Sequence, residues 1–69
     1  MLWIVTSNAS HEIVSCNIHK KESLYQLWVE RSNGKNLKIE EHKNIDRIKD
    51  IKEAIDYAIE KKHKVLRLE

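Results

Sequence analysis

The chain has 69 residues, of which 35% are charged and 41% are hydrophobic, and its formal net charge is +2. A chain of this length forms at most one domain, and so small a domain buries only about 60% of the surface that its unfolded chain exposes. The single cysteine, Cys16, excludes an internal disulfide. We therefore expect residues 1–69 to form one domain that gains stability from a partner subunit, most simply as a homodimer. The small net charge does not by itself indicate a polyanionic partner.

The sequence contains no hydrophobic signal segment and no apolar run long enough to cross a bilayer. Together with the lone thiol, this predicts a cytoplasmic protein without a membrane partner. The chain has no proline and only one glycine, which favours a fold that extends through its whole length.

Four segments in the first two thirds of the chain have the composition of β-strands. The first lies within residues 1–6, where a continuous apolar run is typical of a strand buried on both faces. Residues 7–11 are turn formers. Residues 12–19 and 24–30 alternate apolar with polar side chains, which predicts two half-buried strands, and a fourth strand follows the glycine.

The only glycine, Gly34, marks a hairpin between the third and fourth strands. A two-residue loop would set Val29 opposite a lysine, which is a poor cross-strand pair. A three-residue loop, with Gly34 in a left-handed bulge position, instead sets Val29 opposite Leu37 and Leu27 opposite Ile39. We therefore predict the three-residue loop.

The same test of apolar pairing predicts the turn between the second and third strands. A four-residue loop over residues 20–23 sets Ile18 opposite Tyr25 and Cys16 opposite Leu27. Both turns then place one set of side chains on a common inner face of the sheet. That inner face comprises Val14, Cys16, Ile18, Leu27, Val29, Leu37 and Ile39.

From about residue 44 the hydrophobic period changes to three and four residues, which is typical of an amphipathic helix. Asn44 can cap its start, and Asp50 with Glu53 resembles a capping box that offers a second start. We place the core of the helix at residues 50–62. Its apolar stripe comprises Ile45, Ile48, Ile51, Ala54, Ile55, Ala58 and Ile59.

The C-terminal residues 65–68 have two interpretations. Val65 and the alternation after it favour a short fifth strand, whereas Leu66 also continues the helical stripe, and no glycine or proline stops the helix. As a strand, the segment would lie beside the first strand and antiparallel to it, in the sheet order 5-1-2-3-4. The predicted fold is α+β: an antiparallel four- to five-stranded sheet in the chain order ββββαβ, with one amphipathic helix packed on one face.

No stretch of the sequence carries a catalytic or metal-binding signature. The four histidines do not form pairs at metal-ligand spacing, so we interpret them as solvated loop or strand-end residues. Cys16 lies between apolar positions and is interpreted as a buried thiol, not a nucleophile. A single glycine cannot build a phosphate-binding loop. We therefore predict a non-enzymatic protein with no catalytic residues, no cofactor and no metal.

The face of the predicted sheet opposite the helix carries the functional prediction. Trp28 lies near its centre, with Ile13 and Leu24 as apolar neighbours and Gln26 and Lys38 in a polar surround. An aromatic centre with a polar rim is typical of a protein interface, so these five residues form the predicted partner-binding site. The predicted function is a small protein-binding or regulatory accessory module that acts through the sheet face or an edge strand and self-associates. The alternative is that the sheet curls and covers Trp28 itself.

A second hypothesis is a nucleic-acid-binding domain, in which Trp28 stacks on a base and nearby basic residues contact phosphates. Glu30, Glu40 and Glu41 on the same strands, together with the low net charge, favour the protein-binding hypothesis instead. The basic residues concerned are Lys20, Lys21, Arg31, Lys35, Lys38 and Lys43.

Overall fold

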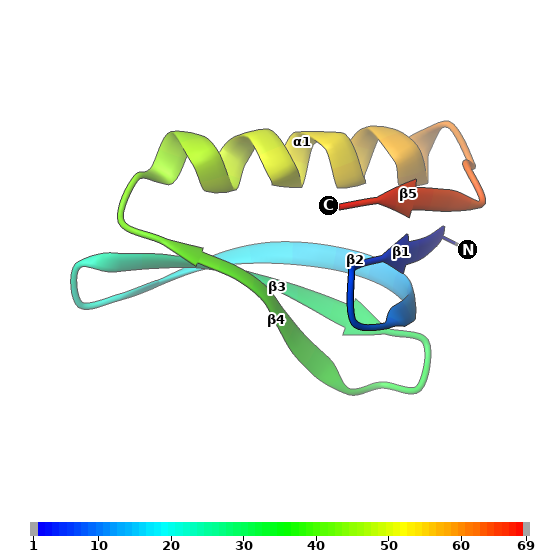
Figure 1. Ribbon diagram of the computed structural model, residues 1–69, viewed down its shortest axis with the longest axis horizontal. Coiled ribbons are helices and arrows are strands. Elements are labelled where there is room, and N and C mark those ends of the chain that lie inside the picture. The colour runs from blue at the N-terminus through cyan, green and yellow to red at the C-terminus, as the bar shows by residue number, and fades with distance from the viewer. Residues whose placement is uncertain (1, 69) are drawn as a thin grey trace.

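The computed structural model describes residues 2–68, which form one sheet and one helix (Figure 1). In chain order the elements are β1 (Leu2–Val5), β2 (Ser10–Lys21), β3 (Leu24–Arg31), β4 (Asn36–His42), α1 (Ile45–Glu60) and β5 (Val65–Arg67). The sheet has the strand order β4-β3-β2-β1-β5, and α1 covers one of its faces. The predicted α+β class, the chain order ββββαβ and the strand order are confirmed.

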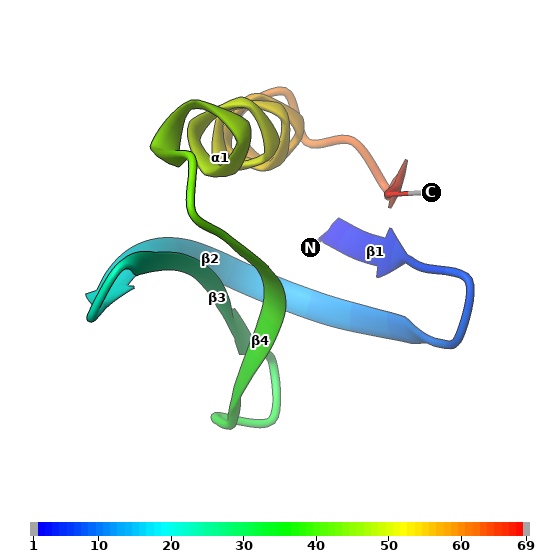
Figure 2. The same cartoon turned by 60° about the vertical axis from the view of Figure 1, so that its left-hand side comes forward.

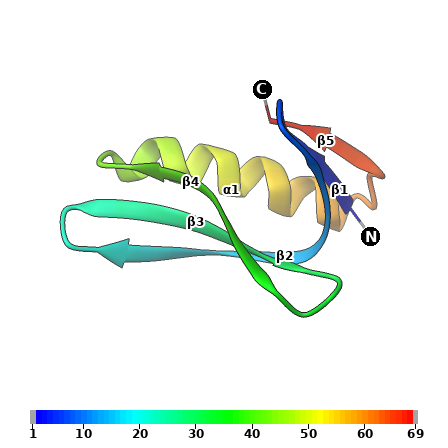
Figure 3. The same ribbon diagram turned by 60° about the horizontal axis from the view of Figure 1, so that its bottom comes forward.

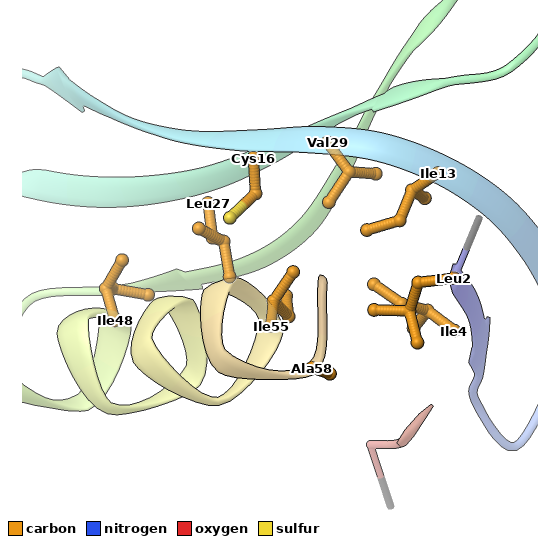
Figure 4. Close-up of a cluster of buried hydrophobic side chains, with 9 residues drawn as sticks. All are labelled: Leu2, Ile4, Ile13, Cys16, Leu27, Val29, Ile48, Ile55 and Ala58. Atoms are coloured by element: carbon orange, nitrogen blue, oxygen red, sulfur yellow. The ribbon is translucent and has the colours of Figure 1, made fainter. Parts of the chain in front are cut away.

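The core lies between the sheet and α1. Alternate residues of β1 and β3 point toward the apolar stripe of the helix (Figure 4). Leu27, Ile48 and Ile55 are each 0% exposed, and burying one side chain of this size contributes about 1.5–3 kcal/mol. The buried cluster comprises Leu2, Ile4, Ile13, Cys16, Leu27, Val29, Ile48, Ile55 and Ala58.

α1 begins at Ile45, earlier than the predicted helix core at residues 50–62. Of the two candidate starts, the cap at Asn44 forms: its Oδ1 accepts the backbone N–H of Asp46 at 2.9 Å. The later capping-box candidate, Asp50, lies inside the helix. The early start brings Ile48, which is fully buried, within the helix, and that burial favours the early start.

The end of α1 is set by backbone geometry and not by glycine. Lys62 takes a left-handed φ of 58°, and its N–H donates to the carbonyl of Ile59 at 3.1 Å. The N–H of His63 donates to the carbonyl of Ala58 at 2.9 Å, which completes a Schellman motif. The chain therefore leaves the helix before Leu66, which lies in β5 and packs against the core.

β5 runs parallel to β1, with Ile4 opposite Leu66, so the sheet is mixed. The prediction that these two strands are antiparallel was wrong. That prediction took the sheet as flat, so that the helical connection would make β5 parallel to β4 and therefore antiparallel to β1. β2 instead curves along its length (Figure 2), so the pair β1–β5 is turned relative to β3 and β4.

A β-bulge in β2 separates its pairing with β1 from most of its pairing with β3. Ile13 pairs with Arg31 and Ser15 with Glu30, which leaves Val14 as the extra residue. Ile13 is 0% exposed in the core, whereas Val14 is 41% exposed. The predicted positions of Ile13 on the outer face and of Val14 on the inner face were therefore wrong, because strict alternation fails at a bulge.

The β2–β3 turn is shorter than the predicted four-residue loop. Lys21 pairs with Leu24, and in the turn between them Glu22 takes a positive φ of 56°. Ile18 lies opposite Leu27 and not opposite the predicted Tyr25. Both registers give apolar pairs, so the sequence test did not separate them. The predicted and observed registers differ by two residues, and a shift of two keeps every side chain on the same face of the sheet. The predicted faces of the β3 side chains were therefore correct.

The β3–β4 turn has the predicted three-residue loop. Gly34 takes a φ of 86°, and its N–H donates to the carbonyl of Arg31 at 2.9 Å. A left-handed conformation of this kind favours glycine, which explains its position here. Val29 lies opposite Leu37, as predicted.

A second irregularity, in β4, changes the pairing further along the hairpin. Leu27 lies opposite Glu40 and not opposite the predicted Ile39, because the register shifts by one residue between Leu27 and Trp28. Beyond the shift, Glu41 lies opposite Gln26. The bulge thus brings a carboxylate to the sheet face that points away from α1.

Candidate functional site

The sheet face turned away from α1, which we call the outer face, holds three predicted site residues in one hydrogen-bonded network. Trp28 lies between two β3 residues that point into the core (Figure 4), so its own side chain points away from the helix. The indole N–H of Trp28 donates to Gln26 Oε1 at 3.0 Å. The Gln26 amide donates to Glu41 Oε2 at 2.6 Å. Lys38 Nζ forms an ion pair with the same oxygen at 3.3 Å.

Gln26 is only 8% exposed although it lies on the outer face. Both ends of its amide are hydrogen-bonded, so its burial leaves no unpaired polar atom. Trp28 is half-buried as well. The hydrogen bond to Gln26, which is itself bonded to Glu41, restricts the orientation of the indole ring.

Glu41 joins the network although no sequence pattern singled it out. The hydrogen bonds from Gln26 and then from Lys38 lower the pKa of its carboxyl group below 4.5. It is therefore a carboxylate at neutral pH. The bulge in β4 sets its position, and a bulge at that point has no glycine or proline to mark it in the sequence.

A shallow hollow of about 270 Å³ lies beside Trp28 on the outer face. The His19 ring approaches the indole with a centroid distance of 6.1 Å and an interplanar angle of 33°. The remaining wall is mostly polar. The lining residues are Asn17, His19, Trp28, Val29, Glu30 and Asn36.

Two of the predicted site residues lie apart from this network. Leu24 is half-buried at the start of β3, next to the β2–β3 turn. Ile13 belongs to the core, where it packs with Leu2 and Ile4, and it is unavailable to a partner. Its inclusion in the outer face followed from the alternation that the bulge at Val14 interrupts.

A second tryptophan, Trp3, lies on the outer face, although the sequence alone did not indicate which face it occupies. Leu2 and Ile4 are buried, whereas Trp3 between them is 44% exposed. It lies opposite Glu12 on one side and the exposed Val65 on the other. The prediction that the first strand is buried on both faces was therefore wrong. An apolar run alone does not reveal which face lacks a covering layer.

Acidic side chains accompany both tryptophans. Glu12 lies directly opposite Trp3. Glu30 lines the hollow beside Trp28 and accepts a hydrogen bond from Ser15 at 3.5 Å. With Glu41 in the network, each of these two tryptophans therefore has a carboxylate nearby.

The single thiol lies on the opposite side of the sheet, under α1. The Cys16 Sγ donates to Asp56 Oδ1 at 3.2 Å, and Asp56 also pairs with Lys52 at 2.5 Å. Burial first, and then the hydrogen bond to Asp56, raise the pKa of the thiol from 9.0 to about 12. A thiol of this kind is protonated at neutral pH and is a poor nucleophile.

Within residues 2–68, no three His, Cys, Asp or Glu side chains are grouped so as to hold a metal ion. No helix in the same range has the length and apolar character needed to cross a membrane. The chain matched no protein-family model, no curated protein and no solved structure in the comparisons made.

Proposed function

We propose that this protein is a non-catalytic accessory module that binds protein through the outer face of its sheet, with a second copy of itself as the simplest partner. One observation carries the proposal: Trp3 and Trp28 lie on the same face, away from the helix, and Trp28 is fixed by a hydrogen-bonded network. Tryptophan is prominent among the residues that dominate binding energy at protein interfaces. A side chain already held in place loses less conformational entropy on binding.

The charge of the outer face supports a protein partner over a polyanion. Glu12 and Glu30 lie beside Trp3 and Trp28, where they would repel phosphates, whereas the charge of Glu41 is offset by its ion pair with Lys38. A partner surface with apolar groups and a few Lys or Arg side chains complements them. We place this activity in the cytoplasm, since a reducing compartment suits a chain with one protonated thiol.

The proposal is tested by solution mass, measured by light scattering over a concentration series. Trp28→Ala should weaken self-association about tenfold or more, because loss of an interface tryptophan typically costs more than 1 kcal/mol. Tyr57→Ala is the matched control, since Tyr57 is an aromatic residue 56% exposed on α1. Circular dichroism verifies that both variants remain folded. A protein that stays monomeric at every concentration, or an equal effect of the two substitutions, would contradict self-association through this face.

The presence of two tryptophans on the outer face also favours a second candidate, the binding of single-stranded nucleic acid. Two indole rings on one sheet face can stack on bases, and Lys38 lies on the same face. Titration with a single-stranded oligonucleotide at low salt should then quench tryptophan fluorescence, and added salt should reverse the effect. An unchanged spectrum at low salt removes this candidate.

A further inference from the structure

β2 is longer than the strand beside it, and this leaves part of one edge open. β1 pairs only with residues 10–13 of β2. On its other side, β2 pairs with β3 as far as Lys21. Among residues 2–68, no strand therefore lies beside residues 14–21 on the side of β1. Figure 3 shows this part of β2, which we call the open edge, at the border of the molecule.

The β2–β3 turn determines which backbone groups point to the open edge. Lys21 and Leu24 flank a tight hairpin turn and therefore bond to each other through their backbone groups. Because the direction alternates along a strand, Cys16, Ile18 and Lys20 direct their N–H and C=O groups away from β3. No other described element donates to or accepts from the backbone of these three residues. Unpaired groups of this kind are a template for another strand.

An apolar hollow of about 320 Å³ lies at one end of the open edge. It lies in line with β1, because Leu2 of β1 pairs with Ile13 of β2. Val14 reaches it only because the bulge turns this side chain out of the core. The lining residues are Leu2, Ile13, Val14, Ile59, Lys62 and His63. An aliphatic side chain at the end of an added strand fits a hollow of this character.

Positive charge flanks both ends of the open edge. Lys20 and Lys21 are exposed at the end near the turn, and Lys62 borders the apolar hollow at the other end. Between them, the carboxylate of Asp56 on α1 is paired with Lys52. An acidic segment therefore complements the edge, since opposite charges favour association and like charges oppose it.

We propose that the open edge binds an extended acidic segment of another protein, which adds to the sheet as a strand antiparallel to β2. Its N-terminal end carries the acidic side chains opposite Lys20 and Lys21, and an aliphatic side chain near its C-terminal end enters the hollow. A second copy pairing through the same edge is disfavoured, because antiparallel pairing would bring Lys20 of one copy toward Lys62 of the other. The open edge is separate from the outer face, so the two proposals can fail independently.

The probe is a synthetic peptide of about eight residues, the length of the open edge. It has two glutamates at its N-terminal end, then alternating threonine and valine, and a leucine near its C-terminal end. At low salt it should bind with a Kd below about 1 mM and slow the amide hydrogen exchange of Ile18 and Lys20. Two control peptides, one with lysines in place of the glutamates and one N-methylated at alternate residues, should each bind about tenfold more weakly.

A pair of protein variants tests the backbone directly. Lys20→Pro removes an N–H that points to the open edge and leaves the β2–β3 hydrogen bonds intact, whereas Lys20→Ala removes the same charge and keeps the N–H. Lys20→Pro should bind the peptide about tenfold more weakly than Lys20→Ala. If Lys20→Pro does not fold, the N-methylated peptide tests the same hydrogen bonds on the unaltered protein.

Several results would overturn the proposal. They are a Kd above about 1 mM at low salt, equal binding by the two Lys20 variants, and perturbation of Trp28 instead of the open edge. A dimer that Lys20→Pro dissolves would assign the edge to a second copy and would also overturn it. Loss of self-association in Trp28→Ala, with peptide binding unchanged, separates this proposal from the one made for the outer face.

Discussion

The two faces of β3 are built from neighbouring residues but are held by different kinds of contact. On the inner face, Leu27 and Val29 are 0% and 1% exposed and pack against α1. On the outer face, Gln26 and Trp28 are held by directional hydrogen bonds that end at Glu41. Packing contributes most of the free energy of folding, whereas the hydrogen bonds fix side-chain positions at a smaller net gain. Substitutions on the two faces should therefore change the free energy of unfolding by different amounts and for different reasons.

The largest expected effect lies on the inner face. Leu27→Ala should lower the free energy of unfolding by about 2–5 kcal/mol, because it leaves a cavity in a fully buried position. Trp28→Ala should cost about 1–2 kcal/mol, since the ring is only half-buried and its removal opens Gln26 Oε1 to water. Urea denaturation followed by circular dichroism measures both. Equal losses would mean that Trp28 belongs to the stabilising core and would remove the distinction between the faces.

An intermediate effect is expected from the polar group on the inner face, the thiol of Cys16. Its pKa is about 12 in the folded protein and 9.0 as an ordinary thiol, so between these values the unfolded state binds fewer protons. The stabilising contribution is therefore fully present below pH 9 and is lost as the pH rises toward 12, by about 1.4 kcal/mol per pH unit at most.

Cys16→Ala is the test of this contribution. The difference in unfolding free energy between the original protein and Cys16→Ala, measured in urea from neutral to alkaline pH, should change only above pH 9. Taking the difference cancels the titration of other groups. If the unfolding free energies of the original protein and of Cys16→Ala keep a constant difference through the alkaline range, the thiol is not held in its protonated form.

The smallest expected effect belongs to the outer face. The pKa of Glu41 is lowered below 4.5 by its hydrogen bonds, so its contribution to stability is present above that pH and is lost as the pH falls through the lowered value. Glu41→Gln should weaken the acid response of Trp28 fluorescence, measured in a Trp3→Phe background. Glu40→Gln is the control, because Glu40 lies opposite Leu27 and not opposite Gln26. If Glu41→Gln and Glu40→Gln change the acid response of Trp28 fluorescence equally, Glu41 does not act on Trp28 through Gln26.

Periodicity was sufficient to predict the larger features of the fold. Alternation predicted the strands, the change of period predicted the helix, and Gly34 predicted its turn, because each depends on local sequence. The opposite directions of Leu27 and Trp28 were also predicted, since a register error of two does not change the face. Trp28 was placed on the outer face for this reason.

Bulges, the short turn and the end of the helix depend on how distant segments pack together, and periodicity could not predict them. The bulge at Val14 moved Ile13 from the predicted site into the core, and no glycine marks it. Glu22 and Lys62 adopt positive φ values without being glycine, so the sequence indicated neither the short turn nor the end of the helix. Such conformations cost about 1–2 kcal/mol and persist because the surrounding packing requires them.

The extra residue in β2 has a consequence for the whole architecture. In a strand with unbroken alternation, Ile13 and Cys16 would point to opposite faces of the sheet, because they are three residues apart. Val14 inserts a half-period offset, so the first half of β2 can turn Ile13 inward beside β1 while the second half turns Cys16 inward beside β3. One continuous strand thereby joins the β3–β4 part and the β1–β5 part of the five-stranded sheet, and a single helix covers the inner side chains of both.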